Sequence, residues 1–177
     1  MKQLRLLLIA LIFINKLSCV FSQGTLAPKY SNEFLSIGVG ADALGMGNAV
    51  VAQTNSAFSS YWNPAGILGV NKWLEIGGMH SEYFAGIAKY DFLSAIHSID
   101  KQSAFGVSMM RFAVDNIPNT TQLIDQQGNI DYSKVTSFSA ADYAFLLTYA
   151  RKTKIDGLNL GGSAKIIHRI VGDFAHS

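Results

Sequence analysis

Apolar and polar residues alternate with a period of two along several long segments of this chain, the first of which begins at Trp73. In residues 86–96 one face carries Ala88, Tyr90, Phe92 and Ile96, and the other carries Lys89 and Asp91. A period of two is that of a β-strand whose two faces meet different surroundings. The chain from Trp73 onward is therefore predicted to form a sheet.

Three further segments repeat the alternation, which is softer in residues 103–112. Their apolar sets are Phe105, Val107 and Met109 in residues 103–112, Tyr143, Phe145, Leu147 and Tyr149 in residues 143–152, and Leu158, Leu160, Ala164 and Ile166 in residues 158–167. Residues 73–79 are the weakest of the five predicted strands. The segments run for about 9–12 residues, which suits a tilted strand that crosses a bilayer, whereas soluble strands average about 5–6.

The second face of these strands carries Lys89, Asp91, Asn159 and Lys165. An apolar face with aromatic ends and a charged opposite face favour lipid outside and a polar lumen inside. The predicted fold is all-β, a transmembrane antiparallel β-barrel, with those four residues facing the lumen. Two alternatives stay open. One is that the charged side chains, together with Arg169, form structural ion pairs between strands. The other is that the fold is a soluble periplasmic β-sandwich.

The predicted connections differ in length. Three are short, at residues 80–85, 98–102 and 154–157, and one is long, at residues 113–142. The long one falls where strand alternation requires an external loop, as in outer-membrane barrels. Five strands cannot close a barrel, since about eight is the minimum, and open edges in lipid leave backbone groups unpaired. We therefore expect the chain to be the N-terminal part of a longer barrel.

The N-terminus has the pattern of a secretory signal peptide over residues 1–22. Lys2 and Arg5 precede an apolar run from Leu6 to Ile14, and small residues favour a cut after Ser22. A lipid anchor at Cys19 is the alternative. Removal of residues 1–22 takes away three basic residues and no acid, so the net charge falls from +2 to −1. Export to the outer membrane is the predicted localisation.

The mature sequence excludes several kinds of chemistry. It has no basic run, which argues against nucleic-acid binding. Its only cysteine leaves with the signal peptide, so disulfides and thiolate sites are excluded. The histidines are scattered without ligand spacing. No catalytic residue, metal site or cofactor is predicted.

Residues 23–72 precede the strands, first as an irregular leader and then, from residue 37, as a glycine-rich segment with only two charged residues. Short helical turns are expected near Ala41–Ala52 and Ala57–Leu68, because glycine and asparagine interrupt any longer helix. Pro64 is suited to a first helical turn that Asn63 caps.

The stretch FLSIGVGADALGMGNAVVAQTNSAFSSYWNPAGI, residues 34–67, resembles the N-terminal signature of the PorV/PorQ family of outer-membrane proteins, relatives of the FadL transporters. The resemblance covers nearly all of residues 34–175. It implies a FadL-like barrel with a plug in residues 23–72 and the first five strands in residues 73–177. The plug and hinge positions are then Gly38, Gly40, Leu44, Gly45, Gly47, Tyr61, Trp62, Asn63, Pro64 and Gly66. Tyr61 and Trp62 are expected to pack the plug against the barrel wall.

The resemblance also implies a function. PorV-like members act in type IX protein secretion or surface attachment of cargo, without enzymatic activity, so secretion components, cargo proteins and outer-membrane lipid are the expected partners. The alternative is a FadL-like channel for hydrophobic solutes, which an apolar pocket behind the plug would favour. Gly38, Gly40 and Ala43 also fit a dinucleotide-binding pattern, but no acidic residue follows at about 20 residues, so these glycines are interpreted as structural.

Overall fold

The computed structural model describes residues 32–124, 127–172 and 174–176. The chain divides into two units, residues 1–32 and Glu33–Ser177, and the account below concerns the second. The predicted signal peptide, the cut after Ser22 and the alternative anchor at Cys19 lie outside the described residues.

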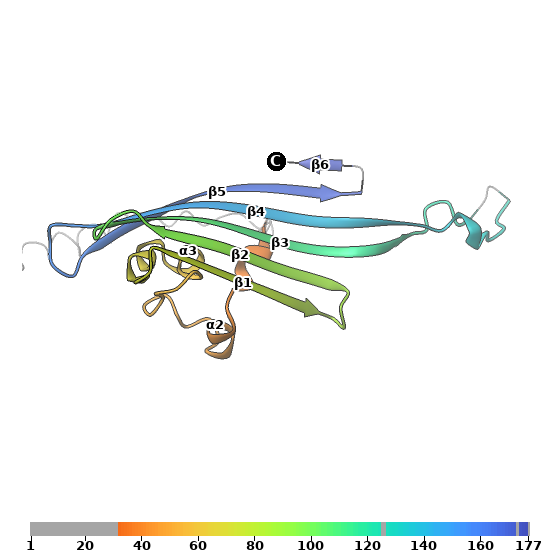
Figure 1. Cartoon of the computed structure of the whole chain (residues 1–177). Coiled ribbons are helices and arrows are strands. Elements are labelled where there is room, and N and C mark those ends of the chain that lie inside the picture. The colour runs from red at the N-terminus through yellow and green to blue at the C-terminus, as the bar shows by residue number, and fades with distance from the viewer. Residues whose placement is uncertain (1–31, 125–126, 173, 177) are drawn as a thin grey trace, which may run out of the picture. The chain divides into compact units, whose positions relative to one another are not determined.

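The described residues form one antiparallel sheet in which every strand pairs with its neighbours in sequence (Figure 1). The strands are β1 (Leu74–Tyr83), β2 (Ala88–Ser98), β3 (Ser103–Asn119), β4 (Thr136–Lys152), β5 (Asn159–Val171) and the short β6 (Phe174–His176). The sheet is not closed, because β1 and β6 are its two edge strands. The all-β prediction with five long strands is confirmed, and β6 was not predicted.

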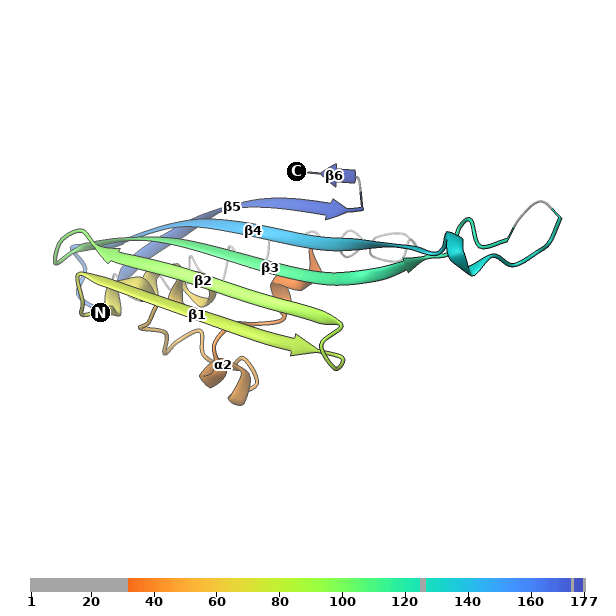
Figure 2. The same ribbon diagram turned by 45° about the vertical axis from the view of Figure 1, so that its right-hand side comes forward.

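The loop predicted at residues 113–142 is shorter in the structure, because β3 continues to Asn119 and β4 begins at Thr136. The two strands stay paired as far as Asn119 and Thr136. Their hairpin projects beyond the other strands (Figures 1 and 2), and the connection that remains is residues 120–135. It contains the single-turn η4 (Tyr132–Lys134).

Pro118 and Asn116 explain why the sequence suggested a loop. A register shift between Val114 and Ile117 accommodates Asn116, which has a φ of 57°. Pro118 lies past Val114, the last residue of β3 that pairs with β2, so β3 has a free edge there, where proline is tolerated. The bulge at Asn116 and the free edge at Pro118 thus allow β3 to contain two residue types that normally end a strand.

Four short helical segments precede β1: η2 (Glu33–Ser36), α2 (Ala41–Gly45), α3 (Ser59–Trp62) and η3 (Pro64–Gly69). α2, α3 and η3 lie in the two regions where short helical turns are expected, whereas η2 was not predicted. None of the helices in the described ranges has the length and apolar character required to span a membrane. We call residues 33–70 the cover, because they pack on one face of the sheet.

Asn63 caps η3 as predicted. Its backbone is extended, with φ −151° and ψ 103°, and its Oδ1 accepts a hydrogen bond from the Ala65 N–H at 3.1 Å. Pro64 follows as the first residue of the helix, where its lack of an N–H costs nothing. The Asn63 Nδ2 donates to the Val51 carbonyl at 3.0 Å, which joins η3 to the preceding loop.

The register divides the side chains into two faces. The covered face, beneath the cover, includes Tyr90, Phe92, Ser94, Ile96, Ser108, Met110, Leu146 and Thr148, all buried. The open face includes Ile76, Leu93, Val107, Phe145, Leu147 and Ile166, all exposed. The sheet thus carries apolar side chains on both faces. Those of the covered face pack against the cover, and those of the open face are exposed.

The shared lumen-facing assignment of Lys89, Asp91, Asn159 and Lys165 is wrong. Lys89 and Asp91 alternate with Tyr90 and lie on the open face. Asn159 and Lys165 pair across with Lys152 and Leu146 and lie on the side of the covered face. The error arose because the apolar row of β2 is buried under the cover, whereas the apolar rows of β3 to β5 are exposed.

The cover comes close to the strands at two glycines. A Cβ built on Gly77 of β1 would lie 2.7 Å from the Ala57 Cβ. A Cβ on Gly161 of β5 would collide with the backbone of Pro64 and Ala65, at the start of η3. Both are strand positions where a side chain would push the cover away from the sheet.

We predict that Gly161→Ala lowers the free energy of unfolding by about 1–3 kcal/mol, the usual cost of overpacking. Gly162→Ala is the matched control, since its Cβ would meet nothing within 4 Å on the open face. Urea titration, with protease sensitivity of residues 33–70 as second readout, measures both. Equal effects of the two substitutions would show that the close approach is unimportant.

Candidate functional site

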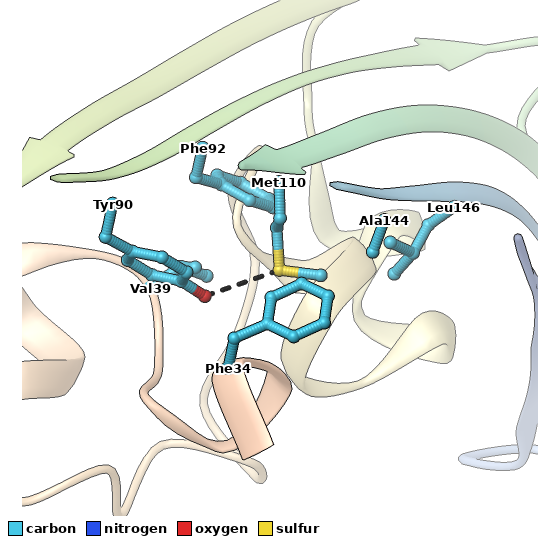
Figure 3. Close-up of a cluster of buried hydrophobic side chains, with 7 residues drawn as sticks. All are labelled: Phe34, Val39, Tyr90, Phe92, Met110, Ala144 and Leu146. Atoms are coloured by element: carbon cyan, nitrogen blue, oxygen red, sulfur yellow. Dashed lines mark hydrogen bonds between the residues drawn. The ribbon is translucent and has the colours of Figure 1, made fainter. Parts of the chain in front are cut away.

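The candidate site is the interface between the cover and the covered face. Its centre is a buried cluster shown in Figure 3. Phe34 and Val39 come from the cover, and Tyr90, Phe92, Met110, Ala144 and Leu146 come from β2, β3 and β4. The Tyr90 hydroxyl donates to the Met110 sulfur at 3.4 Å, so this phenol has a partner within the apolar cluster. The first residues of the cover are thus anchored to three strands.

Tyr61 and Trp62 hold the first segment of the cover in place. The Tyr61 hydroxyl donates to the Leu35 carbonyl at 2.5 Å and accepts from the Gly38 N–H at 3.1 Å. The Trp62 Nε1 donates to the Val39 carbonyl at 2.9 Å. Burial raises the pKa of the Tyr61 phenol, so it stays protonated and can donate at neutral pH. The two aromatic residues therefore satisfy backbone groups that no secondary structure pairs.

The same rings also contact the sheet. The Tyr61 ring meets the Phe92 ring edge-on, with centroids 6.4 Å apart. Phe58, one helical turn earlier, stacks on Phe92 at 5.6 Å. Tyr61 and Trp62 pack edge to face at 4.7 Å. The α3 segment thus lies between the first segment of the cover and the sheet.

A triangle of buried serines connects α3 to β2 and β3. The Ser60 Oγ lies 2.6 Å from the Ser108 Oγ and 3.1 Å from the Ser94 Oγ, and Ser108 donates to Ser94 at 2.9 Å. All three side chains are buried. Unpaired buried hydroxyls are costly, so the triangle favours one position of α3 on the sheet.

Two further contacts join the cover to β1. The Glu75 carboxylate accepts from the Ala57 N–H at 2.8 Å, just before α3 begins. The Gly40 N–H is directed at the Met79 sulfur at 3.2 Å. The cover is therefore bonded to the edge strand as well as to the middle of the sheet.

The glycines of the predicted plug motif have different roles. Gly38, Gly40 and Gly47 have φ values of 97°, 93° and 60°, which favour glycine. A Cβ on Gly66 would lie 2.6 Å from the Thr54 carbonyl oxygen, so close packing requires this glycine. Gly45 has open space around it and Leu44 is exposed, and nothing in the structure explains either residue.

The Tyr61–Gly66 motif lies inside the cover, at the junction of α3 and η3, whereas β1 begins at Leu74. Its residues fasten the cover to itself and to the sheet. A hinge role for this motif stays a prediction.

The open face presents an apolar surface across all five long strands. Ile76, Leu93 and Ile166 are 63%, 53% and 60% exposed, and Val107, Phe145 and Leu147 lie between them. Phe105 and Tyr149 continue the surface toward the short turns. An apolar surface that spans a sheet is unusual on a soluble protein and marks contact with lipid or protein.

A polar row crosses the open face next to this surface. The Asp91 carboxylate lies 2.6 Å from the His80 Nδ1 and 3.2 Å from the Arg111 Nη1, and Arg111 also donates to the Tyr143 hydroxyl at 3.3 Å. Lys89 pairs with Asp115 at 3.2 Å. The alternative interpretation of Lys89 and Asp91 as members of interstrand ion pairs is thus confirmed. It also holds for Arg169, which pairs with Asp142 across β4 and β5.

The arrangement offers binding and packing surfaces. Within the described ranges, no group of three or more His, Cys, Asp or Glu side chains is placed to hold a metal ion.

Sequence reasoning missed the residues on the sheet that receive the cover. These are Gly77, Gly161, Ser94 and Ser108, and the two serines bond to Ser60 of the cover. The available signal was the small residues at alternate strand positions, such as Gly106 and Ser108, which a search for chemical motifs does not detect.

We predict that Ser60→Ala and Ser108→Ala are coupled by about 0.5–2 kcal/mol in a double-mutant cycle, because either removes a shared buried hydrogen bond. Ser163→Ala is the control, since Ser163 bonds to Thr148 at 2.8 Å instead. Its effect should add to that of Ser60→Ala. Urea unfolding measures both cycles. If the effects of Ser60→Ala and Ser108→Ala were additive, as in the Ser163 control, the hydrogen bonds of the serine triangle would be contradicted.

Comparison with known proteins gives one match. A family model described as the type IX secretion system protein PorV matches residues 25–161, which include the cover and the first four strands. Searches of curated proteins and of solved structures returned no match. The matched range exceeds half of the chain, so the protein belongs to the PorV family of the type IX secretion system.

Proposed function

We propose that this protein is a non-enzymatic outer-membrane component of the type IX secretion system. The family match supports the secretion role. The observation that carries the membrane assignment is the exposed apolar open face on strands of 10 to 17 residues. Strands of this length can cross a bilayer when tilted.

The cover acts as a plug in this proposal. It occupies the face of the sheet opposite the lipid-facing one, where the interior of a barrel lies. It contacts the sheet through buried aromatic rings, hydrogen-bonded hydroxyls and glycines that leave no room for a side chain. Such contacts are suited to a plug that stays in one position. A plug keeps solutes from leaking while cargo is handled at the surface.

The orientation follows from the connections. The turns at residues 99–102 and 153–158 are short, and the β3–β4 hairpin extends past the other strands (Figure 2). Short turns face the periplasm and long connections face outward in outer-membrane barrels. We place the polar row of Asp91 and Arg111 toward the outside.

A second candidate function is a channel for hydrophobic solutes. An open cleft of about 840 Å³ lies between the cover and β1. Val39, Met46, Val50, Phe58, Trp62 and Met79 supply its apolar lining. An apolar pocket of this size is suited to a small hydrophobic ligand. Loss of cargo secretion without any change in solute uptake, on deletion of the gene, favours the secretion role.

The membrane assignment predicts that Leu147→Arg lowers folding stability in a bilayer by about 2–4 kcal/mol, as for a cation on the lipid face of a barrel. Asn159→Arg, on the other side of the sheet, should change it by under about 0.5 kcal/mol. Recovery of each variant from the outer-membrane fraction provides the cellular readout. Equal recovery of both variants would contradict lipid contact at the open face.

The plug assignment predicts that Trp62→Ala loosens the cover. The substitution removes the bond to the Val39 carbonyl and should cost about 3 kcal/mol, the low end for a tryptophan, because Trp62 is half-buried. Solute leakage through reconstituted protein and protease cleavage in residues 33–50 should both rise. Trp73→Ala is the matched control, since Trp73 is 73% exposed. Unchanged leakage and cleavage in Trp62→Ala would refute the plug.

A further inference from the structure

Five cations gather at the short-turn end of the sheet. We call Lys72, Lys101, Arg151, Lys152 and Lys154 the basic rim; all are exposed. Lys101 lies in the turn between β2 and β3, and Lys154 in the turn between β4 and β5. The Lys152 N–H donates to the Gln102 carbonyl at 2.8 Å, which joins the two turns. The Ser98 N–H donates to the Trp73 carbonyl at 3.0 Å and brings Lys72 to the same end.

The rim keeps an excess of positive charge, because the acids at this end are Glu75, Asp100 and Asp156 against five cations. Across the described ranges, the only ion pair of a rim residue joins Lys72 to Glu75 at 3.9 Å. That glutamate already accepts from the Ala57 N–H. Asp100 interacts electrostatically with Arg151. Its carboxylate also accepts hydrogen bonds from the Gln102 N–H at 2.6 Å and from the Ser103 hydroxyl at 3.3 Å.

The opposite end differs. There Lys89, Arg111, Lys134 and Arg169 each lie within an ion pair. Unpaired positive charge is therefore concentrated at the short turns.

Exposed apolar residues lie among the rim cations. Trp73 is 73% exposed and rests edge-on against His97, and the turns carry the exposed aliphatic residues Ile99, Ile155 and Leu158. Arg151 follows Tyr149 on the open face at a spacing of two, so the rim continues directly from the apolar surface. Tryptophan and tyrosine beside lysine and arginine are typical of the boundary between lipid tails and head groups.

We propose that the basic rim binds the head groups of anionic phospholipids in the leaflet at the short-turn end. The proposal rests on the membrane placement of the open face. Lipid is the occupant because the rim is continuous with the lipid-facing surface, and because its positive charge complements the phosphate of an anionic head group. Each basic residue at an anionic lipid surface contributes about 1 kcal/mol, or about fivefold in binding.

Tryptophan quenching tests this proposal on the full chain reconstituted in vesicles. Trp73 lies at the rim, so brominated phosphatidylglycerol and brominated phosphatidylcholine report which lipid is its neighbour. We expect phosphatidylglycerol to be preferred at least about fivefold at low salt. About 0.5 M NaCl should abolish most of the preference.

Charge variants complete the test. Lys101→Gln with Lys154→Gln should reduce the preference to about one, whereas the matched pair Lys89→Gln with Lys134→Gln should retain it. Preference that inorganic phosphate abolishes at constant ionic strength would overturn the proposal in favour of a free-phosphate site. Equal quenching by both lipids would overturn it too and leave the rim to an acidic protein partner. Quenching by neither lipid would instead contradict the membrane placement itself.

Discussion

The close approach of the cover to the strands is the constraint on which the rest of this structure depends. Gly77 and Gly161 leave no room for a side chain between sheet and cover, and Ser94 and Ser108 meet Ser60 across the gap. Only small residues allow backbone to approach backbone this closely, and their hydroxyls then need partners within the contact. The aromatic cluster around Phe92 fills the neighbouring space.

The constraint divides the sheet into two faces with separate roles. Because one face is buried by residues of the same chain, the apolar residues of the other have no partner among the described residues. The proposed membrane placement gives that exposed surface a partner in lipid. The polar row at one end and the basic rim at the other then mark the two limits of the apolar surface.

The five long strands, their antiparallel order and the Asn63 cap could be predicted from the sequence, because alternation and capping are local patterns. The assignment of faces could not. Phe92 and Phe145 are both apolar residues of alternating strands, yet one packs under the cover and the other is exposed. Periodicity shows that two residues share a face but does not show what the face contacts. Likewise, the extension of β3 through Pro118 depends on where β2 ends, which is a property of the assembled sheet.

Spin labels placed singly at residues 143–150 of β4 test the division into two faces most directly. The account predicts that labels at the odd positions, such as Phe145 and Leu147, collide with dissolved oxygen but not with a water-soluble nickel complex. Labels at the even positions, such as Leu146 and Thr148, should be shielded from both reagents by the cover. High nickel accessibility at the odd positions would contradict lipid contact, and high accessibility at the even positions would contradict the cover.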